Sequence, residues 1–471
     1  MLTIFAGLEM KKFTRILICL MLCVLTFGFV ACDTRTEEEK NFTYPSSNDY
    51  VYGNGGLAVK KGNYVYFVNG YQSVENISSK RATYTVGSLM LMKLGENGEV
   101  VTNKEGLVDD DYYITMNNKL CGYEATNLYI HDDYLYFATP CLENESGDET
   151  WAKERVVFSR IKLDKTGKVE EVYSADVKYD QLEYQYYEQE DGDLYILVWE
   201  KGESYYDDKG SNVLVRVNAT NKTSTKISTD VTGVIFAKEA DEIFFAKHSS
   251  SDELYSLKQF NIVENEVTNY YNFEKSFEPK FVANGCVYVT IAHDYGTSTD
   301  IQMSVIANKS GFETVYSYTD AVELNVTSDG NVLLISSNKI SIVTDIDETV
   351  DIVDEDATEI NVVDFTNGCI LYYNTTSENS NIKLVSYNNA LYGGDASIKT
   401  LATIAKVEED YAYFDYNDGE NNLYFYQKTG ENYYLNRIKV NNNLEETFEM
   451  FGEYLEGDIP VVEEEVEEEE E

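Results

Sequence analysis

The stretch ANGCVYVTIAHD, residues 283–294, contains a small polar turn, a run of β-branched and aromatic residues, and a polar end. Similar stretches recur at 60–70 (KKGNYVYFVNG), 131–140 (HDDYLYFATP) and 365–375 (FTNGCILYYNT). β-branched and aromatic residues favour strands, and turns with glycine, asparagine or aspartate favour hairpins. The repetition therefore predicts one short antiparallel unit that occurs many times along the chain.

Aligned on this strand, the chain divides into eight units of roughly fifty residues between about residues 55 and 450, a period typical of four-stranded blades. We name the strands of each unit A to D, and the recurring strand is B. The B strands are predicted at 64–69, 134–139, 193–199, 242–248, 286–293, 331–337, 369–374 and 422–427. The C strands are predicted at 88–94, 155–163, 212–218, 253–260, 302–308, 339–345, 381–387 and 433–440. The D strands follow short turns, for example at 167–175 and 311–319.

A single four-stranded sheet of this kind cannot bury both of its faces, whereas copies packed face to face around an axis can. The sequence therefore predicts an all-β fold, a β-propeller of eight four-stranded blades, or of seven if the first or last unit is incomplete. A β-solenoid is the competing repeat architecture, but its units are shorter and more regular. The segment NDYVYG (48–53) is expected to add a strand that closes the ring.

The composition fits a large globular β protein and limits its partners. The chain has 471 residues, 43% of them hydrophobic, and 40 of them are tyrosine, a residue that favours strands. The formal net charge is −46. Nucleic acids and anionic membrane surfaces are therefore poor partners, because binding phosphate requires clustered lysine and arginine. Cationic ligands or metal ions are favoured, although the charge alone names none of them.

The N-terminal segment carries the most specific motif of the chain. A basic region precedes the uncharged stretch ILICLMLCVLTFGFVA (16–31), which is rather short for a transmembrane span of about twenty residues. The sequence FVAC, with Ala31 before Cys32, resembles the lipobox of bacterial lipoproteins, whose signal peptidase cuts before a cysteine that carries diacylglycerol. The family usually has leucine where Phe29 stands. The resemblance implies lipidation of Cys32, and the alternatives are an ordinary cleaved signal or an uncleaved anchor.

We therefore predict four segments, which are a lipoprotein signal peptide (1–31), a lipid-anchored tether (32–50), a β-propeller (51–455) and an acidic disordered tail (456–471). The tail ends in EEEVEEEEE, whose like charges repel one another and which has almost nothing apolar to bury. The expected location is the extracytoplasmic face of a bacterial cell membrane, where the lipid anchor is the only membrane contact.

Two of the cysteines outside the signal segment and the lipobox are placed so that they can pair. Cys121 precedes strand A of the second unit and Cys141 follows its strand B, and antiparallel pairing of A and B brings these ends to one edge. A disulfide there would close a loop of roughly twenty residues and contribute about 3 kcal/mol in the chain-entropy model. Cys286 and Cys369 each open a B strand two units apart, so we expect them to be small buried hydrophobic residues that do not pair.

The longest connections predict a ligand-binding face. Propeller topology places the A–B and C–D turns on one face and the B–C and D–A connections on the other. The second set is long in the first units, at 71–87, 105–124, 140–154 and 200–211. Long loops with aromatic residues on a rigid scaffold often bind ligands, although solvated loops that bind nothing are the alternative. The predicted ligand contacts are Asp109, Asp110, Asp111, Tyr112, Tyr113, Trp151, Tyr205 and Tyr206.

The sequence has no motif for catalysis, for a metal or for a cofactor. It contains no HExxH, GxSxG, phosphate-loop or CxxC pattern, so no catalytic residue, metal ligand or cofactor is predicted. His131 lies in an A–B turn, and His248 and His293 end B strands of adjacent units. We expect hydrogen-bonded or solvent-facing histidines, and a shared zinc site is the alternative. The acid-rich stretch 345–359 lacks the glycine and spacing of an EF-hand loop.

The units GNYVYFVN and DDYLYFAT resemble the G-x-x-[IVL]-Y-[FY] blades of bacterial propeller lipoproteins of unknown function, which are related to the propellers of the low-density-lipoprotein-receptor type. The resemblance covers about residues 55–450, and its motif carries no catalytic residue. With the predicted anchor, it favours a monomeric, non-enzymatic binding or scaffold protein for a protein, peptide or glycan ligand. The alternatives are a carbohydrate-active hydrolase or lyase with carboxylates near the axis, and an envelope-assembly accessory factor.

Overall fold

The chain divides into two units, residues 1–44 and 45–471, and all described strands belong to the second. The computed structural model describes residues 44–450 except for 57, 75–83, 96–97, 100, 102–112, 123–126, 141–154, 178–181, 190, 202–211, 237–241, 249–253, 284–285, 293–299, 308–311, 320–322, 327–330, 346–347, 367, 378, 406–413, 418–421, 430–431 and 441–445. No helix within these ranges is long and apolar enough to span a membrane.

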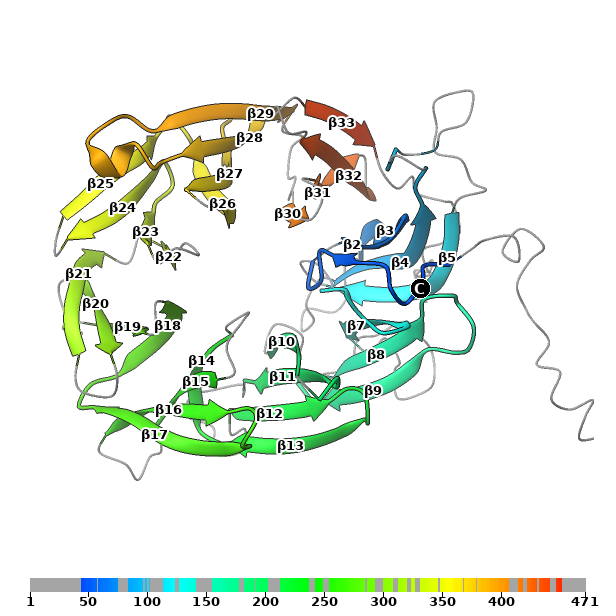
Figure 1. Cartoon of the computed structure of the whole chain (residues 1–471), viewed down its shortest axis with the longest axis horizontal. Coiled ribbons are helices and arrows are strands. Elements are labelled where there is room, and N and C mark those ends of the chain that lie inside the picture. The colour runs from blue at the N-terminus through cyan, green and yellow to red at the C-terminus, as the bar shows by residue number, and fades with distance from the viewer. Residues whose placement is uncertain are drawn as a thin grey trace, which may run out of the picture. The chain divides into compact units, whose positions relative to one another are not determined.

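The described residues of the second unit form a β-propeller in which six four-stranded antiparallel sheets follow one another in chain order (Figure 1). We call them blades I to VI. Blade I holds β6 (Tyr129–His131), β7 (Tyr134–Pro140), β8 (Val156–Lys162) and β9 (Glu170–Ala175). Blade II holds β10 (Leu182–Glu188), β11 (Leu194–Glu200), β12 (Val213–Asn218) and β13 (Thr223–Ser228). Blade III holds β14 (Val231–Ile235), β15 (Glu242–Lys247), β16 (Tyr255–Asn261) and β17 (Glu266–Phe273).

The next three blades repeat the same order. Blade IV holds β18 (Phe277–Ala283), β19 (Cys286–Ala292), β20 (Asp300–Ala307) and β21 (Phe312–Thr319). Blade V holds β22 (Glu323–Val326), β23 (Val332–Ile335), β24 (Lys339–Asp345) and β25 (Glu348–Asp354). Blade VI holds β26 (Glu359–Thr366), β27 (Cys369–Thr375), β28 (Asn379–Ser386) and β29 (Ser397–Ala405), with the 3₁₀ helix η3 (Ala390–Tyr392) between its last two strands.

The two ends of the repeat region share one nine-stranded sheet, which we call the terminal sheet. Its N-terminal strands are β1 (Val51–Tyr52), β2 (Ala58–Lys61), β3 (Tyr64–Val74), β4 (Tyr84–Lys93) and β5 (Tyr113–Gly122). Its C-terminal strands are β30 (Phe414–Asn417), β31 (Asn422–Thr429), β32 (Asn432–Val440) and β33 (Glu446–Met450). The two groups meet where β3 pairs with β32, with Tyr71 opposite Tyr433 and Gln72 opposite Asn432.

The blade number corrects the sequence prediction. Eight blades, or seven, were expected, and the described residues form six. The segments predicted as the first and last blades do not stand apart, because β3 continues past Asn69 through a register shift and reaches β32. The segment 48–53 does add a strand, since β1 pairs with β2 and Val51 lies opposite Lys61.

Most of the individual strands were predicted correctly. Each of the eight predicted B strands overlaps a strand of the structure, and so does each predicted C strand. The errors concern two connections. Residues 71–74 and 84–87 belong to β3 and β4, so the predicted loop 71–87 is shorter than expected. Residues 113–122 form β5 beside β4, so part of the predicted loop 105–124 is strand.

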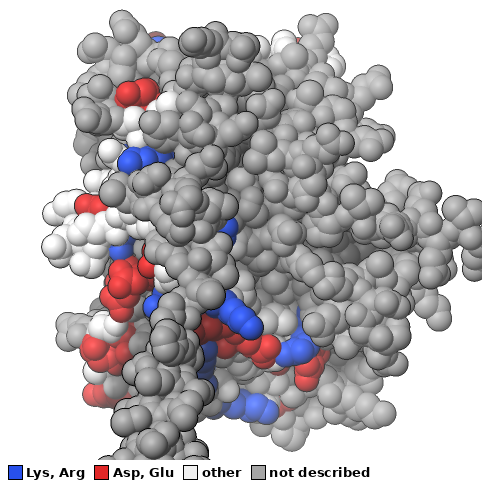
Figure 2. All heavy atoms as spheres, turned by 90° about the vertical axis from the view of Figure 1, so that its right-hand side faces the viewer, with Lys and Arg blue, Asp and Glu red and all other residues white. Residues whose placement is uncertain are grey.

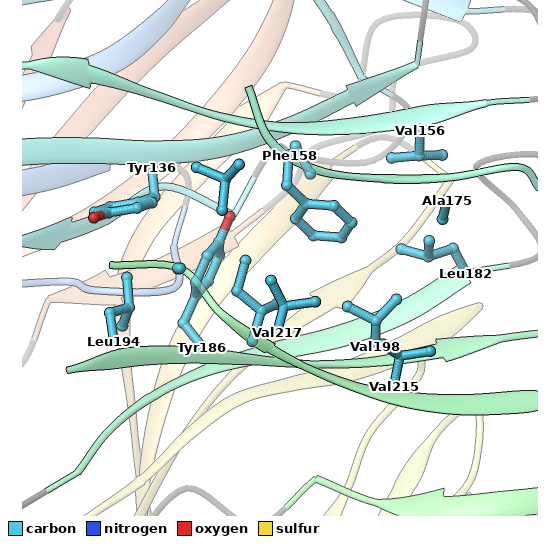
Figure 3. Close-up of a cluster of buried hydrophobic side chains, with 14 of the residues drawn as sticks. Tyr136, Val156, Phe158, Ala175, Leu182, Tyr186, Leu194, Val198, Val215 and Val217 are labelled. Atoms are coloured by element: carbon cyan, nitrogen blue, oxygen red, sulfur yellow. The ribbon is translucent and has the colours of Figure 1, made fainter. Parts of the chain in front are cut away.

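The strands of a blade are covered on both faces by the two neighbouring blades. In β11, Ile196 packs into the cluster between blades I and II, and the next residue, Leu197, packs into the cluster between blades II and III. Figure 3 shows the first cluster, in which Phe158 of blade I lies near Tyr186 and Val217 of blade II. Alternate residues of a strand point to opposite faces, so a strand covered on both sides is apolar throughout. This explains continuous runs such as LYILV (194–198).

Candidate functional site

A pocket of about 1060 Å³ lies among the A–B turns of blades I and II and the N-terminal residues of the second unit. Its lining includes Asp49 and Asn54 before β2, His131 at the end of β6, and Glu188 at the end of β10. Val263, in the β16–β17 turn of blade III, also contributes. The volume is in the upper range of small-molecule and cofactor sites. The pocket is at the opposite ends of the blade strands from the long loops that were predicted to bind.

Two tight turns position the polar groups of the pocket. In the turn between β6 and β7, His131 lies opposite Tyr134, and Asp132 has a φ of 53°, a conformation that aspartate tolerates better than most residues. In the turn between β10 and β11, Gly192 has a φ of 82° and the carboxylate of Asp191 accepts the Asp193 amide at 2.9 Å. These contacts fix the turn backbones, so the side chains have defined positions.

His131 connects blade I to blade II at the wall of the pocket. The side chain is 8% exposed. Its Nδ1 lies 3.1 Å from Oε1 of Glu188, and its Nε2 lies 3.1 Å from the carbonyl oxygen of Gly192. Both of these atoms are acceptors, so only the protonated ring donates to both. The expectation of a hydrogen-bonded histidine is confirmed here.

The surroundings shift the pKa values of this pair in opposite directions. Burial lowers the pKa of His131, but the hydrogen bond and charge of Glu188, with the charge of Asp132 and the Gly192 carbonyl, outweigh burial and raise it above its ordinary value. The hydrogen bond from His131 lowers the pKa of Glu188, against the opposing effect of burial. The structure therefore favours a charged pair across the boundary between the blades.

The N-terminal segment forms another wall of the pocket. The Asn54 side chain donates to the Ile130 carbonyl at 2.9 Å and accepts the Ile130 amide at 2.7 Å. Gly56 forms an antiparallel bridge with Leu128 next to this contact. Lys61, which is 3% exposed, donates from Nζ to the Asp132 carbonyl at 2.7 Å. The segment before β2 is thus fixed along the edge of blade I.

Tyrosine rings form one apolar part of the lining, and aliphatic and phenyl side chains, chiefly from blades II and III, form the rest. The ring of Tyr129 stacks on that of Tyr186 with centroids 5.0 Å apart, and Tyr187 stacks on Tyr195 at 5.7 Å. The Arg216 guanidinium lies 4.0 Å from the Tyr195 centroid. Burial raises the pKa of Tyr187 to about 12, against the lowering effect of the Arg216 charge. The Tyr187 phenol is therefore neutral at physiological pH.

Carboxylates outnumber cationic groups around the pocket. Its lining contains one lysine, Lys61, and one histidine, and it contains four carboxylates, which are Asp49, Asp132, Glu188 and Asp191. Among the described residues, the face drawn in Figure 2 carries both acidic and basic side chains. The excess of acid in the pocket lining follows the composition of the chain, which has 83 aspartate and glutamate residues and 37 lysine and arginine residues.

Most of the predicted ligand contacts lie outside the described residues. This holds for Asp109, Asp110, Asp111, Tyr112, Trp151, Tyr205 and Tyr206. The backbone of Tyr113 begins β5, opposite Met92 of β4. Cys32, the predicted lipidation site, and Cys141 are also outside the described residues, and the backbone of Cys121 lies in β5 opposite Val86. The predicted disulfide and binding face stay predictions.

The remaining cysteine and histidine expectations have mixed outcomes. Cys369 is a free thiol at the start of β27, but it is half-buried where full burial was expected. The His248 ring stacks on Tyr255 at 4.0 Å, and His293 lies outside the described residues. Among the residues that the structure describes, no group of three or more histidine, cysteine, aspartate or glutamate side chains is placed to hold a metal.

None of the pocket residues was predicted to form a binding site, and His131 was expected only to be hydrogen-bonded or solvent-facing, with a shared zinc site as the alternative. The stretches HDDY (131–134) and DGD (191–193) occupy equivalent A–B turns in adjacent units, and both were interpreted only as tight turns. A signal was present, because both turns carry acidic residues and one carries a histidine. Comparing equivalent turns between neighbouring units would have placed these groups near one another.

No protein-family model matches the chain, and no curated protein matches it significantly. Solved propeller structures are similar to it. The β-propeller domain of the Trilobed protease from Pyrococcus furiosus is 13% identical, with 66% of this chain and 92% of that chain covered and a TM-score of 0.44. The polysaccharide lyase Uly1 is 12% identical, with 67% of this chain and 89% of that chain covered and a TM-score of 0.38. TolB from Acinetobacter baumannii is 10% identical, with 72% of this chain and 80% of that chain covered and a TM-score of 0.31. These similarities concern the fold alone.

Proposed function

We propose that the protein is a membrane-anchored binding lipoprotein of the extracytoplasmic face, and that its propeller holds a ligand in the pocket between blades I and II. The pocket itself is the observation that carries the proposal. Its volume of about 1060 Å³ accommodates a short peptide segment or an oligosaccharide. Hydrogen-bonded turns and the Asn54 contact hold its walls in place. A site built on fixed elements needs little reorganisation when a ligand binds.

Binding is favoured over glycoside hydrolysis at this site. A glycosidase needs one carboxyl group that stays protonated as the general acid, which requires a raised pKa. The pKa of Glu188 is lowered instead, because His131 donates to its carboxylate. Asp191 accepts the Asp193 amide and the Tyr195 hydroxyl, so it acts as part of the turn. A scaffold role in envelope assembly would use the same anchored propeller.

The anchor is tested by replacing Cys32 with serine. The native protein should incorporate radiolabelled palmitate and partition with the membranes, and Cys32→Ser should lose the label. An unlabelled native chain would contradict the lipoprotein part of the proposal and would leave the pocket unaffected.

The pocket is tested by filling it. A thermal-shift screen of the protein against basic peptides and neutral oligosaccharides should find a stabilising ligand. Gln185→Trp, at a half-buried lining position, should abolish the shift. Val263→Trp, at a lining position that is 71% exposed, serves as a second blocking variant if the first one misfolds. A ligand that stabilises both blocked variants as well as the native protein would place the site elsewhere, with the long loops and Trp151 as the next candidates.

A further inference from the structure

We infer that the pocket binds its ligand through an ammonium or guanidinium group, as carried by a lysine- or arginine-containing peptide. The inference rests on the proposed function and specifies the ligand of the same pocket. Three observations support it. Donors in the lining already donate within the protein, the carboxylates can accept further hydrogen bonds, and tyrosine rings also line the pocket.

Three donors of the lining, on Lys61, His131 and Asn54, are already used within the protein. Lys61 Nζ donates to the Asp132 carbonyl at 2.7 Å. Both His131 nitrogens face acceptors at 3.1 Å. The side-chain amide of Asn54 donates to Ile130 at 2.9 Å. An anionic ligand would have to displace these contacts, so a ligand rich in acceptors is disfavoured.

The carboxylates retain capacity to accept hydrogen bonds. A carboxylate has about four lone-pair sites. The Asp49 carboxylate accepts the Ser46 amide at 2.8 Å, and the Asp132 side chain is 77% exposed, with its closest cationic partner, His131 Nε2, at 3.6 Å. The carboxylate of Asp191 accepts from two neutral donors, which are the Asp193 amide and the Tyr195 hydroxyl, and it too is exposed. A cationic donor matches both the charge and the hydrogen-bonding capacity of these groups.

The aromatic part of the lining suits the same ligand. Tyrosine faces attract ammonium and guanidinium groups, and they also pack against the apolar stem of a lysine or arginine side chain. Arg216 already makes this contact with Tyr195, the ring that stacks on Tyr187 of the pocket. A ligand cation next to Tyr129 or Tyr187 would use the same chemistry.

The test is fluorescence anisotropy with a dye-labelled tetralysine peptide at about 0.15 M salt, where the Debye length is about 8 Å and distant charges are screened. The peptide should bind the native protein, and its Nε-acetylated analogue should not. A pocket variant, Asp49→Asn with Asp132→Asn and Asp191→Asn, should weaken binding about tenfold or more. Asp132→Asn alone, at a position whose side chain is 77% exposed, should weaken it about twofold and serves if the triple variant misfolds.

A charge-matched control variant separates the pocket from the net charge of −46. Glu348→Gln with Asp356→Asn and Asp395→Asn removes three exposed carboxylates that do not line the pocket. Its affinity for tetralysine should change less than about twofold. Equal weakening in both variants would overturn the inference. Binding of neutral maltotetraose in place of tetralysine would overturn the ligand class and leave the proposed binding function standing. If nothing bound in the wider screen either, the proposed function itself would fail.

Discussion

Two junctions between blades use a carboxylate in different ways. At the junction of blades I and II, Glu188 bonds to His131 beside a pocket, and the Glu188 side chain is 52% exposed. At the junction of blades V and VI, Glu355 is 16% exposed and bonds to Lys383 at 2.8 Å, and it also accepts from Tyr372 and Asn374. The first junction contains a histidine, the side chain that titrates near neutral pH, and the second contains none of this kind.

The Glu355 junction stabilises the fold, whereas the His131 junction borders the pocket. The Glu355 network fixes the connection between β25 and β26 against β27 and β28, and no pocket residue belongs to it. The largely buried Glu355 carboxylate accepts several donors. Its removal therefore leaves the largely buried ammonium group of Lys383 without this partner. The His131 pair is more exposed on its acidic side, so we expect a smaller contribution to stability and a dependence on pH.

The largest expected effect is at the junction of blades V and VI. Glu355→Ala should reduce the free energy of unfolding by about 3 kcal/mol, because it removes the partner of a Lys383 side chain that is 15% exposed. Urea denaturation followed by circular dichroism measures the change. Glu348→Ala, an exposed position in β25, is the control and should change stability by less than about 0.5 kcal/mol. A loss below about 1 kcal/mol at Glu355 would remove the contrast between the two junctions.

A smaller, pH-dependent effect is expected at the pocket junction. His131→Gln should cost about 1 kcal/mol near pH 6, where the charged pair is present. The raised pKa of His131 means that its contribution is complete below the ordinary value of 6.5 and is lost as the pH rises through the folded-state pKa. The lowered pKa of Glu188 means that its contribution is present above 4.5 and is lost as the pH falls through its folded-state pKa.

Denaturation at several pH values from 4 to 9 tests this window. The stability difference between native protein and His131→Gln should be largest at mildly acidic pH and should shrink above neutrality. A His131→Gln cost that is the same at pH 6 and pH 9 would show that folding does not raise the pKa of this histidine.

The smallest effect concerns the N-terminal wall of the pocket. Asn54→Ala removes two hydrogen bonds to the Ile130 backbone at an exposed position, so it should cost about 0.5–1 kcal/mol. Hydrogen exchange is the sharper measurement, because the Ile130 amide loses its acceptor and should exchange faster. Asn272→Ala, at an exposed position in β17, should leave that amide unchanged. Unchanged exchange in Asn54→Ala would mean that the segment does not form this wall.

The local pattern of the sequence predicted the strands well and the blade number poorly. VYVTI (287–291) and ILYY (370–373) indicate buried strands because a strand covered on both faces must be apolar throughout. The pairing of Tyr71 with Tyr433 leaves no such trace, because any strand edge offers the same backbone groups to any partner. The union of the first and last units in one sheet therefore could not be deduced from the repeat.

The candidate site was hidden for a related reason. Asp132 and Gly192 are residues that tight turns prefer, so turn formation alone explains their presence. The partner of His131 lies in the next blade, and the sequence does not show which residue of that turn it faces. The long B–C and D–A connections led to a predicted binding face at the other ends of the strands, because loop length indicates where insertions are tolerated. The pocket uses short turns whose side chains meet only once the blades are packed.

The joined terminal sheet has a consequence for the order in which the protein is made. Arg437, which is 1% exposed in β32, donates to the carbonyl of Gly98, 339 residues earlier in the chain. During synthesis, β3 emerges long before β32 and has an unpaired edge until that strand arrives. Contacts between such distant segments form slowly. The nascent chain is therefore most exposed to aggregation and proteolysis just before its last strands appear, and chaperones would matter most at that stage.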